Sequence, residues 1–244
     1  MIINILTLFP EMFTPLSQSM LGRAAENGIL DIRLFNIRDY TEDKHNRVDD
    51  TPFGGGAGMV MQVQPILSAM RTNNLTGRTL YMSPRGRMLD GALAEDLSGE
   101  DEITILCGHY EGVDQRALDL IGAEEVTIGD YILTGGELPA MVLVDTVARF
   151  LDGVLAGEES VKEESIYSGL LEYPHYTKPR EVEGLSVPDV LVSGNHEKIA
   201  LWRYEESLRL TKERRPDLFE KYLASEPELS KKERKILEAV RSEE

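Results

Sequence analysis

The chain has 244 residues, of which 41% are hydrophobic, so it can form one or two folded domains with a buried core. No run of about 18 apolar residues occurs, and we therefore expect no membrane-spanning helix. A formal net charge of -17 argues against non-specific nucleic-acid binding through bulk charge. The single cysteine excludes an intrachain disulfide, and a reducing, cytoplasmic location is expected.

The first 150 residues alternate short apolar runs with helical patterns. The apolar runs predict strands at residues 2–9, 32–37, 79–82, 103–107 and 126–133. Helical patterns occur at residues 11–27, 64–72 and 90–97, and an apolar helical stripe begins near Pro139. Strands that alternate with helices indicate an α/β fold with a parallel sheet. Ligands of such sheets bind outside the carboxyl ends of the strands.

The chain changes character after residue 155. Residues 156–172 are polar, charged and without a helical period, which indicates an interdomain linker. We therefore expect a first domain at residues 1–155 and a small, all-helical second domain at residues 173–244.

Two helix starts can be recognised in the second domain. Ser193 or Asn195 can cap one helix, which Pro216 ends. Ser230 and Glu233 have the spacing of a capping box and predict another helix.

Charge is distributed unevenly along the chain. Residues 196–244 carry 12 basic and 12 acidic side chains, so the first 195 residues account for the whole negative charge. Residues 198–215 carry six basic and three acidic side chains. This segment is either a solvated helix face or a local basic surface, and its composition favours the first interpretation.

Three glycine-bearing loops follow predicted strands. They read SPRG at residues 83–86, CGHYEGVDQR at residues 107–116 and IGDYILTGGELPAM at residues 128–141. Together they predict one pocket with many main-chain donors and acceptors and little side-chain bulk. Such a pocket suits a flat, polar small molecule such as an adenosine cofactor.

A further glycine run, FGGGAGM at residues 53–59, lacks the strand before it and the helix after it that a dinucleotide fingerprint requires. Taken by itself it predicts a mobile loop, which could approach a base or a ribose closely. Walker-type, zinc-hydrolase and serine-esterase motifs are absent from the sequence.

Several acidic side chains are candidates for proton transfer, although each also has a structural interpretation. Asp145 and Arg149 have the spacing of a surface ion pair on one helix. Glu111 could decorate a turn, while Glu163 and Glu164 could solvate the linker.

Several motifs, in order along nearly the whole chain, resemble one family. They read LFPEMF at 8–13, DD at 49–50 with GGGAGM at 54–59, GHYEG at 108–112, IGDY at 128–131, GGELP at 135–139, PHYT at 174–177, SGNH at 193–196 and RRP at 214–216. The chain resembles bacterial tRNA (guanine-N1)-methyltransferases of the SPOUT class.

The resemblance implies an α/β SPOUT domain whose loops near 83–86, 107–116 and 128–136 form a trefoil knot that binds S-adenosylmethionine. It also implies a homodimer with an interfacial active site, and no membrane partner. The implied reaction is methylation of N1 of guanine 37 in tRNA when a guanine precedes it. Family activity is linked to Mg²⁺, whose site the sequence does not locate.

The resemblance also implies roles for individual residues. Glu164 would be the general base, Arg149 would stabilise the guanine O6, and Glu111 would orient the sulfonium or a metal. The implied cofactor-binding residues are Tyr81, Ser83, Pro84, Gly108, Tyr110, Ile128, Gly129, Asp130, Tyr131, Ile132, Leu133, Gly135 and Gly136. The implied substrate-binding residues are Asp50, Gly54, Gly55, Ser165, His175, Tyr176, Arg203, Arg214 and Arg215.

Three positions depart from the family pattern. Glu164 stands where the family usually has Asp, Ile166 where it has Phe and Lys178 where it has Arg. A glutamate is one methylene longer and has a pKa about 0.4 unit higher, so efficiency and the identity of the base depend on how the linker adapts. Two alternatives therefore stay open: a SPOUT ribose 2′-O-methyltransferase, and a tRNA-binding module without catalysis.

Overall fold

The computed structural model describes residues 1–155 and 169–243. The chain divides into two compact units, Met1–Gly157 and Glu158–Glu244, which are considered separately below. The predicted linker includes residues 156–168, which lie outside the described residues. The linker and the domain bounds given by the sequence therefore stay predictions.

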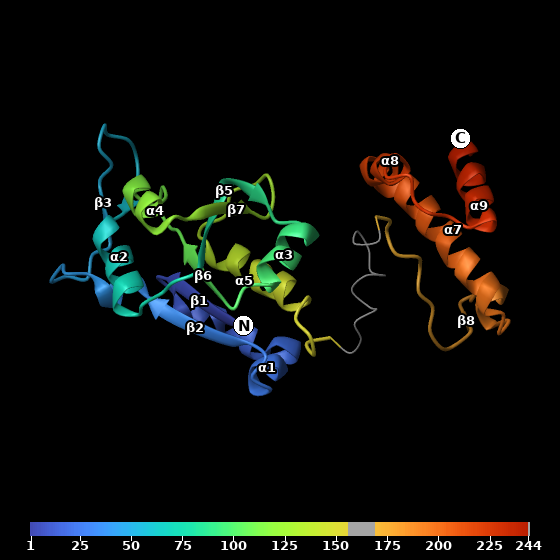
Figure 1. The fold of residues 1–244 in the computed structure, drawn as a ribbon, viewed down its shortest axis with the longest axis horizontal. Coiled ribbons are helices and arrows are strands. Elements are labelled where there is room, and N and C mark those ends of the chain that lie inside the picture. The colour runs from blue at the N-terminus through green and yellow to red at the C-terminus, as the bar shows by residue number, and fades with distance from the viewer. Residues whose placement is uncertain (156–168, 244) are drawn as a thin grey trace. The chain divides into compact units, whose positions relative to one another are not determined.

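The first unit contains a five-stranded sheet (Figure 1). Its strands are β1 (Ile2–Thr7), β2 (Asp31–Asn36), β5 (Arg78–Met88), β6 (Glu102–Cys107) and β7 (Glu124–Thr127), in the order β2-β1-β6-β5-β7. Every neighbouring pair is parallel. The prediction of an α/β fold with a parallel sheet is confirmed.

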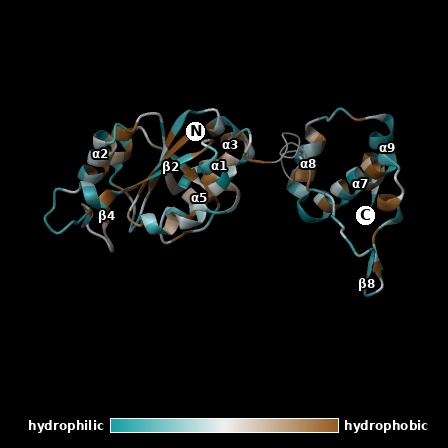
Figure 2. Ribbon diagram, turned by 90° about the horizontal axis from the view of Figure 1, so that it is seen from below, coloured by the Kyte–Doolittle hydropathy of each residue, from teal (hydrophilic) through white to brown (hydrophobic). Residues whose placement is uncertain are grey.

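Helices cover both faces of the sheet. Successive strand residues point to opposite sides, so the apolar residues of one strand pack against helices on both faces. On one face, Ile3 and Ile5 of β1 pack in a cluster with η1 (Pro10–Ser17), α1 (Ser19–Glu26), α3 (Gly91–Ser98) and α5 (Glu137–Ala148). On the other face, Leu6 packs with η2 (Ile37–Tyr40), α2 (Val63–Thr72) and α4 (Gln115–Ile121). The central strands β1 and β6 are buried on both faces, whereas the edge strand β2 is partly exposed. Figure 2 shows the hydrophobic residues of this unit in brown.

Two predicted elements of this unit are wrong in extent. The expected helix at 11–27 is divided into η1 and α1, with Pro15 inside η1 and a positive φ at Ser19, the first residue of α1. The expected strand at 126–133 ends at Thr127, after which Gly129 takes a φ of 157° and the chain leaves the sheet. The apolar side chains that follow are loop residues.

The sequence did not predict the short hairpin of β3 (Asp49–Asp50) and β4 (Val60–Met61), nor helix α4. The hairpin is two residue pairs long, and only two residues of α4, Ala117 and Leu118, are buried. Neither element is long enough to give a clear hydrophobic period.

The second unit contains α7 (His196–Arg214), α8 (Pro216–Ala224) and α9 (Lys231–Ser242), which pack around Leu170, Leu208, Phe219 and Val240. Both helix starts occur as predicted: the Asn195 side chain accepts from the Lys198 N–H, and Ser230 with Glu233 forms a capping box. The unit also holds η3 (Asp189–Val192) and a hairpin of β8 (Glu181–Val182) and β9 (Leu185–Ser186). The described part of this unit is therefore not all-helical. Across both units, none of the described helices is both long and apolar enough to cross a membrane.

Candidate functional site: a cofactor pocket

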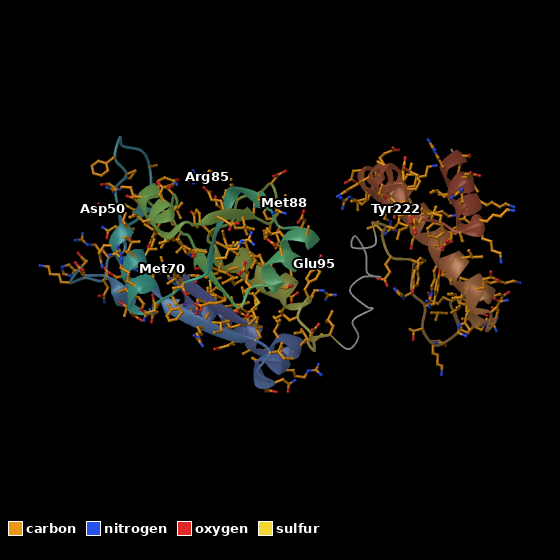
Figure 3. The ribbon with its side chains drawn as sticks, in the orientation of Figure 1. Asp50, Met70, Arg85, Met88, Glu95 and Tyr222 are labelled. Atoms are coloured by element: carbon orange, nitrogen blue, oxygen red, sulfur yellow. The ribbon has the colours of Figure 1, made fainter. Side chains whose placement is uncertain are left out.

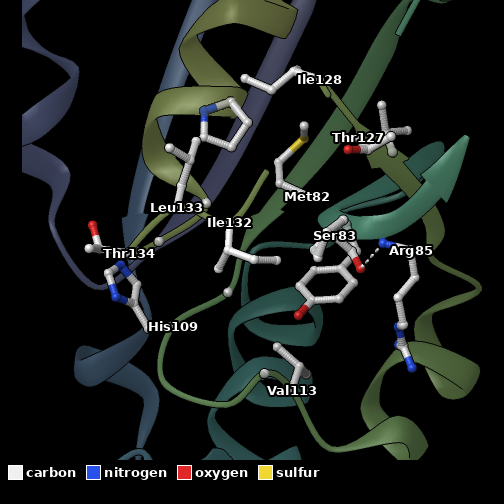
Figure 4. Close-up of a pocket in the computed structure, with 18 of the residues that line it drawn as sticks. Met82, Ser83, Arg85, His109, Val113, Thr127, Ile128, Ile132, Leu133 and Thr134 are labelled. Atoms are coloured by element: carbon white, nitrogen blue, oxygen red, sulfur yellow. Dashed lines mark hydrogen bonds between the residues drawn. The ribbon is translucent and has the colours of Figure 1, made fainter. Parts of the chain in front are cut away.

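The three predicted loops come together at the carboxyl ends of β5, β6 and β7 and enclose a cavity of about 540 Å³ (Figure 4). The first loop interrupts β5, since Met82 and Arg87 both lie opposite Val126 of β7, so residues 83–86 leave the ladder between them. A cavity of this size is typical of a small-molecule site.

Most of the predicted cofactor-binding residues line this cavity. They are Tyr81, Ser83, Pro84, Gly108, Tyr110, Ile128, Gly129, Tyr131, Ile132, Leu133, Gly135 and Gly136, and Glu111 lies with them. Asp130 does not reach the wall. The wall also contains His109, Arg85 and Thr134, which sequence reasoning missed although they lie in the same loops.

Two of the loops are held together by main chain. The Gly136 N–H donates to the Gly108 carbonyl at 2.9 Å. A Cβ atom at Gly136 would lie 2.7 Å from Cys107 Cα and 2.9 Å from the Gly108 nitrogen, closer than real Cβ contacts come. Glycine is therefore required at residue 136 for this approach of the loops.

A buried polar network stabilises the same two loops. Glu137, which is 1% exposed at the start of α5, accepts from the Thr7 hydroxyl at 2.7 Å, and its other oxygen lies 2.7 Å from His109 Nε2. The His109 ring packs edge-on against Phe9 at 4.9 Å between centroids. The network joins β1, the 107–116 loop and α5, so it holds the side chain of His109 in place at the pocket wall.

Two pocket-side groups have raised pKa values. Burial, together with the charge of Glu137, raises the pKa of the Cys107 thiol well above its ordinary value, so the thiol is protonated and has no role as a nucleophile. Burial, with a smaller contribution from Glu125, raises the pKa of Tyr81. Both groups are therefore neutral at physiological pH.

The glycine run at 54–58 joins the loop that carries Glu111. The Glu111 N–H donates to the Met59 carbonyl, and the Met61 N–H donates to the Gly112 carbonyl, each at 2.9 Å. A Cβ atom at Gly58 would lie 2.4 Å from Glu111 Cγ. The structure thus brings the end of the β3–β4 connection, at Gly58 and Met59, beside the predicted acid. The predicted substrate residues Gly54 and Gly55 lie earlier in this connection, and Asp50 (labelled in Figure 3) lies at the end of β3.

The other predicted catalytic residues are not assigned to the cavity wall. Arg149 is the C-cap residue of α5 and does not line the cavity. Glu164 and Ser165 lie outside the described residues, as does the alternative base Glu163.

The predicted substrate residues of the second unit form contacts with aromatic and acidic neighbours. The Arg203 guanidinium lies 4.7 Å from the centre of the Tyr173 ring, and Tyr176 lies near Trp202 at 6.3 Å between ring centres. His175 Nε2 is 2.9 Å from a Glu172 carboxylate oxygen.

The basic residues of α7 and its C-cap residue Arg215 differ in whether other protein groups pair with them. Arg209 pairs with Glu205 and Glu243, and Arg215 pairs with Asp217. Lys212 donates to carbonyls at the end of α9, including that of Val240 at 2.8 Å. Within the described residues, Arg214 forms no ion pair.

No group of three or more His, Cys, Asp or Glu side chains that could hold a metal occurs among the described residues. The pocket lies at the carboxyl edge of a parallel sheet, the usual place for a nucleotide-like cofactor in this class of α/β protein, and glycines expose main chain in its wall.

Comparison with known proteins gives the family. The model of the tRNA (Guanine-1)-methyltransferase TrmD family matches residues 1–221. A tRNA (guanine-N(1)-)-methyltransferase of Alkaliphilus oremlandii is 54% identical, with 99% of each chain covered. Relatives of the same name from Lactobacillus helveticus and Clostridioides difficile are each 52% identical, covering 99% and 89% of this chain and 98% and 97% of the relatives. The chain belongs to the tRNA (Guanine-1)-methyltransferase TrmD family, as its motifs indicate.

Proposed function

We propose that this protein transfers the methyl group of S-adenosylmethionine to N1 of guanine 37 in tRNA. The observation that carries the proposal is similarity at about 50% identity, over nearly the full length, to relatives named for guanine-N1 methylation of tRNA. A methyltransferase family implies this methyl donor, and the choice of position 37 rests on the resemblance described above.

The pocket fits the cofactor on its own geometry. Glycines at residues 108, 129, 135 and 136 expose main-chain groups in its wall, with Tyr81, Ser83 and Pro84 beside them as the adenosine side. The Glu111 carboxylate at the same wall suits the positive sulfonium. These loops are also the segments for which the resemblance implies a trefoil knot.

Guanine N1 carries a proton and becomes nucleophilic as that proton leaves. The Glu164 carboxylate takes the proton as general base, and Arg149 stabilises the charge that develops on O6. The bound cofactor supplies an electrophilic methyl group, so the N1–C bond forms as the S–C bond breaks and a neutral thioether leaves. Main-chain positioning in the pocket supplies much of the acceleration.

A magnesium requirement is part of the proposal. Mg²⁺ is commonly held by one or two carboxylates, with substrate groups and water completing its shell. Glu111 is the carboxylate of the pocket wall that could serve. Such a site does not need a preformed cluster of protein ligands.

The active form is proposed to be a homodimer. Leu138 and Val142 lie one turn apart on α5 with about half of each side chain exposed, and Ile132 of the pocket loop is 79% exposed. Exposed apolar side chains at helical spacing are typical of a protein interface. A second copy that covers this face would place its own residues beside the pocket.

The test is methyl transfer from labelled S-adenosylmethionine to an unmodified tRNA transcript with guanines at positions 36 and 37. A transcript with adenine at position 37 is the substrate control. Nucleoside analysis identifies the product, which separates N1 methylation from ribose methylation. We expect guanine-dependent transfer, and a product methylated at a ribose would contradict the proposal.

The identity of the base is tested with Glu164→Gln and Glu164→Asp beside the unmodified enzyme. Loss of transfer in Glu164→Gln, with tRNA still bound and activity kept in Glu164→Asp, is the expected result. Transfer that survives Glu164→Gln would move the base to another carboxylate, with Glu163 the first candidate.

A further inference from the structure

Phe53 is an aromatic side chain that the fold leaves almost without protein contact: it is 98% exposed. The chain around it is ordered by hydrogen bonds. The Gly55 N–H donates to the Pro52 carbonyl at 3.3 Å, which closes a turn with Phe53 at its first corner. Gly54 occupies the second corner with a φ of 87°, as a type II turn requires. The turn therefore presents the ring outward.

The turn is connected to the pocket loop by the chain that follows it. It lies between β3 and β4, which pair as Asp49 with Met61 and Asp50 with Val60. Beyond it, Gly58 packs against Glu111, and the Met59 carbonyl accepts from the Glu111 N–H. Gly58 follows Phe53 by five residues, so the two lie within about 17 Å of each other even in an extended chain. A nucleotide or a few of a single strand can span this distance.

The surroundings of the ring suit a flat partner. Added Cβ atoms at Gly54 and Gly55 would meet no other atom within 4 Å, so both faces of the turn are open. Residues 53–58 carry no charged side chain, and Asp50, three residues before Phe53 along the chain, is exposed. An open aromatic face on an uncharged loop is typical of a site where a base stacks.

We propose that Phe53 is a stacking residue for the substrate, whose ring takes the base on one side of the target guanine, at position 36 or 38. This inference rests on the proposed function. It adds to that function a residue that holds the anticodon loop open beside the pocket. Stacking removes the neighbouring base from the loop stack, so the target base is free to enter the site.

The test compares Phe53→Leu, which removes the ring but keeps an apolar side chain, with Phe53→Trp, which keeps a ring. We expect Phe53→Leu to lower kcat/KM for tRNA about 10-fold, within the range of single-base stacking, and to leave KM for S-adenosylmethionine unchanged. Phe53→Trp should stay within about 2-fold of the unmodified enzyme. Leu120→Ala is the matched control, because Leu120 is also exposed but lies on α4 away from the cavity wall.

The partner base is identified with anticodon stem-loops that lack the base at position 36 or 38. These stem-loops are compared by direct binding, because methyl transfer itself needs the guanine at position 36. At the stacked position, the loss of affinity caused by Phe53→Leu should disappear, because the partner base is already absent. Equal losses with all stem-loops, or no loss with any, would overturn the proposal. Light scattering gives a further check, since a mass that falls in Phe53→Leu would assign the ring to a second copy of the chain.

Failure of the proposed function has a different signature. If the unmodified enzyme transfers no methyl group to tRNA, the reaction proposed above is wrong. Direct binding of the same stem-loops by unmodified and Phe53→Leu protein then still tests the stacking contact, since it needs no turnover.

Discussion

Gly136 shows at the scale of one residue why the pocket is formed by main chain. Its N–H and the Gly108 carbonyl bring two loops into contact, and an added methyl group would meet backbone that has no room to move aside. The cofactor site depends on the absence of a Cβ atom at Gly136. A chemically mild substitution should therefore have a large effect here.

Gly136→Ala should lower affinity for S-adenosylmethionine about 10-fold, because overpacking of this kind costs about 1–3 kcal/mol. The thermal midpoint should fall as well. Calorimetric titration of the cofactor and thermal unfolding measure the two effects. Gly99→Ala is the control, since a Cβ atom there meets only the Asp96 carbonyl at 3.4 Å. Unchanged cofactor affinity in Gly136→Ala would contradict this account of the pocket.

At the scale of elements, Arg78 joins three parts of the first unit. From β5 its guanidinium forms two hydrogen bonds to Glu124 of β7, at 2.7 and 2.9 Å, and one to Asp96 of α3. Hydrogen bonding to Arg78 is the largest cause of the lowered pKa of Glu124 and of Asp96. The bridge thus holds the outermost strand of the sheet against its neighbour.

Arg78→Met should lower the free energy of unfolding by about 0.5–1 kcal/mol at pH 7, a modest value because Glu124 is half exposed. A lowered folded-state pKa gives stability that is present above the unfolded value of about 4.5 and is lost as pH falls through the folded value. The difference between the two proteins should therefore shrink below pH 4.5. Urea unfolding at pH 7 and pH 3.5 measures it.

Arg33→Met is the control for that comparison, because Arg33 pairs with Asp31 of its own strand and both side chains are about half exposed. A stability difference for Arg78→Met that grows as the solution becomes more acidic would show that the bridge does not act through the charged carboxylates.

The sequence predicts elements well where burial gives a long, regular pattern. All five strands of the sheet overlap the predicted runs. The overlap is smallest for β7, at two residues, because apolar residues continue past Gly129 into the pocket loop. The loops that form the pocket could be found because they follow strands. The Glu137 network could not, since Thr7 and His109 lie 130 and 28 residues away and meet it only after the sheet has formed.

At the scale of the whole molecule, the exposed apolar face of α5 predicts association. The unmodified protein should have about twice its chain mass of 27.3 kDa in solution. Val142→Glu should give single chains and little methyl transfer, because a charge on this face would be desolvated in the dimer. Light scattering with the transfer assay measures both. Leu120→Glu, at a more exposed position on α4, should remain paired, and a dimer that survives Val142→Glu would place the interface elsewhere.

The acidic composition predicts how tRNA binding depends on salt. Two of the basic residues on α7, Arg209 and Lys212, are already engaged by protein groups, so few cations remain for phosphates. The slope of log affinity against log salt concentration should be shallower than about -6. Titrations of labelled tRNA at several salt concentrations measure it. A steeper slope would mean that many more phosphates are contacted than the composition allows.

The main-chain character of the pocket wall has a consequence for inhibitors. A competitor that bonds to the amides and carbonyls of residues 108, 129, 135 and 136 would contact groups that every substitution except one to proline leaves in place. Resistance through a changed side chain would have to act by steric obstruction, and at Gly136 obstruction also separates the loops that the cofactor needs. A substitution at Gly136 that prevents inhibitor binding should therefore also lower enzyme activity.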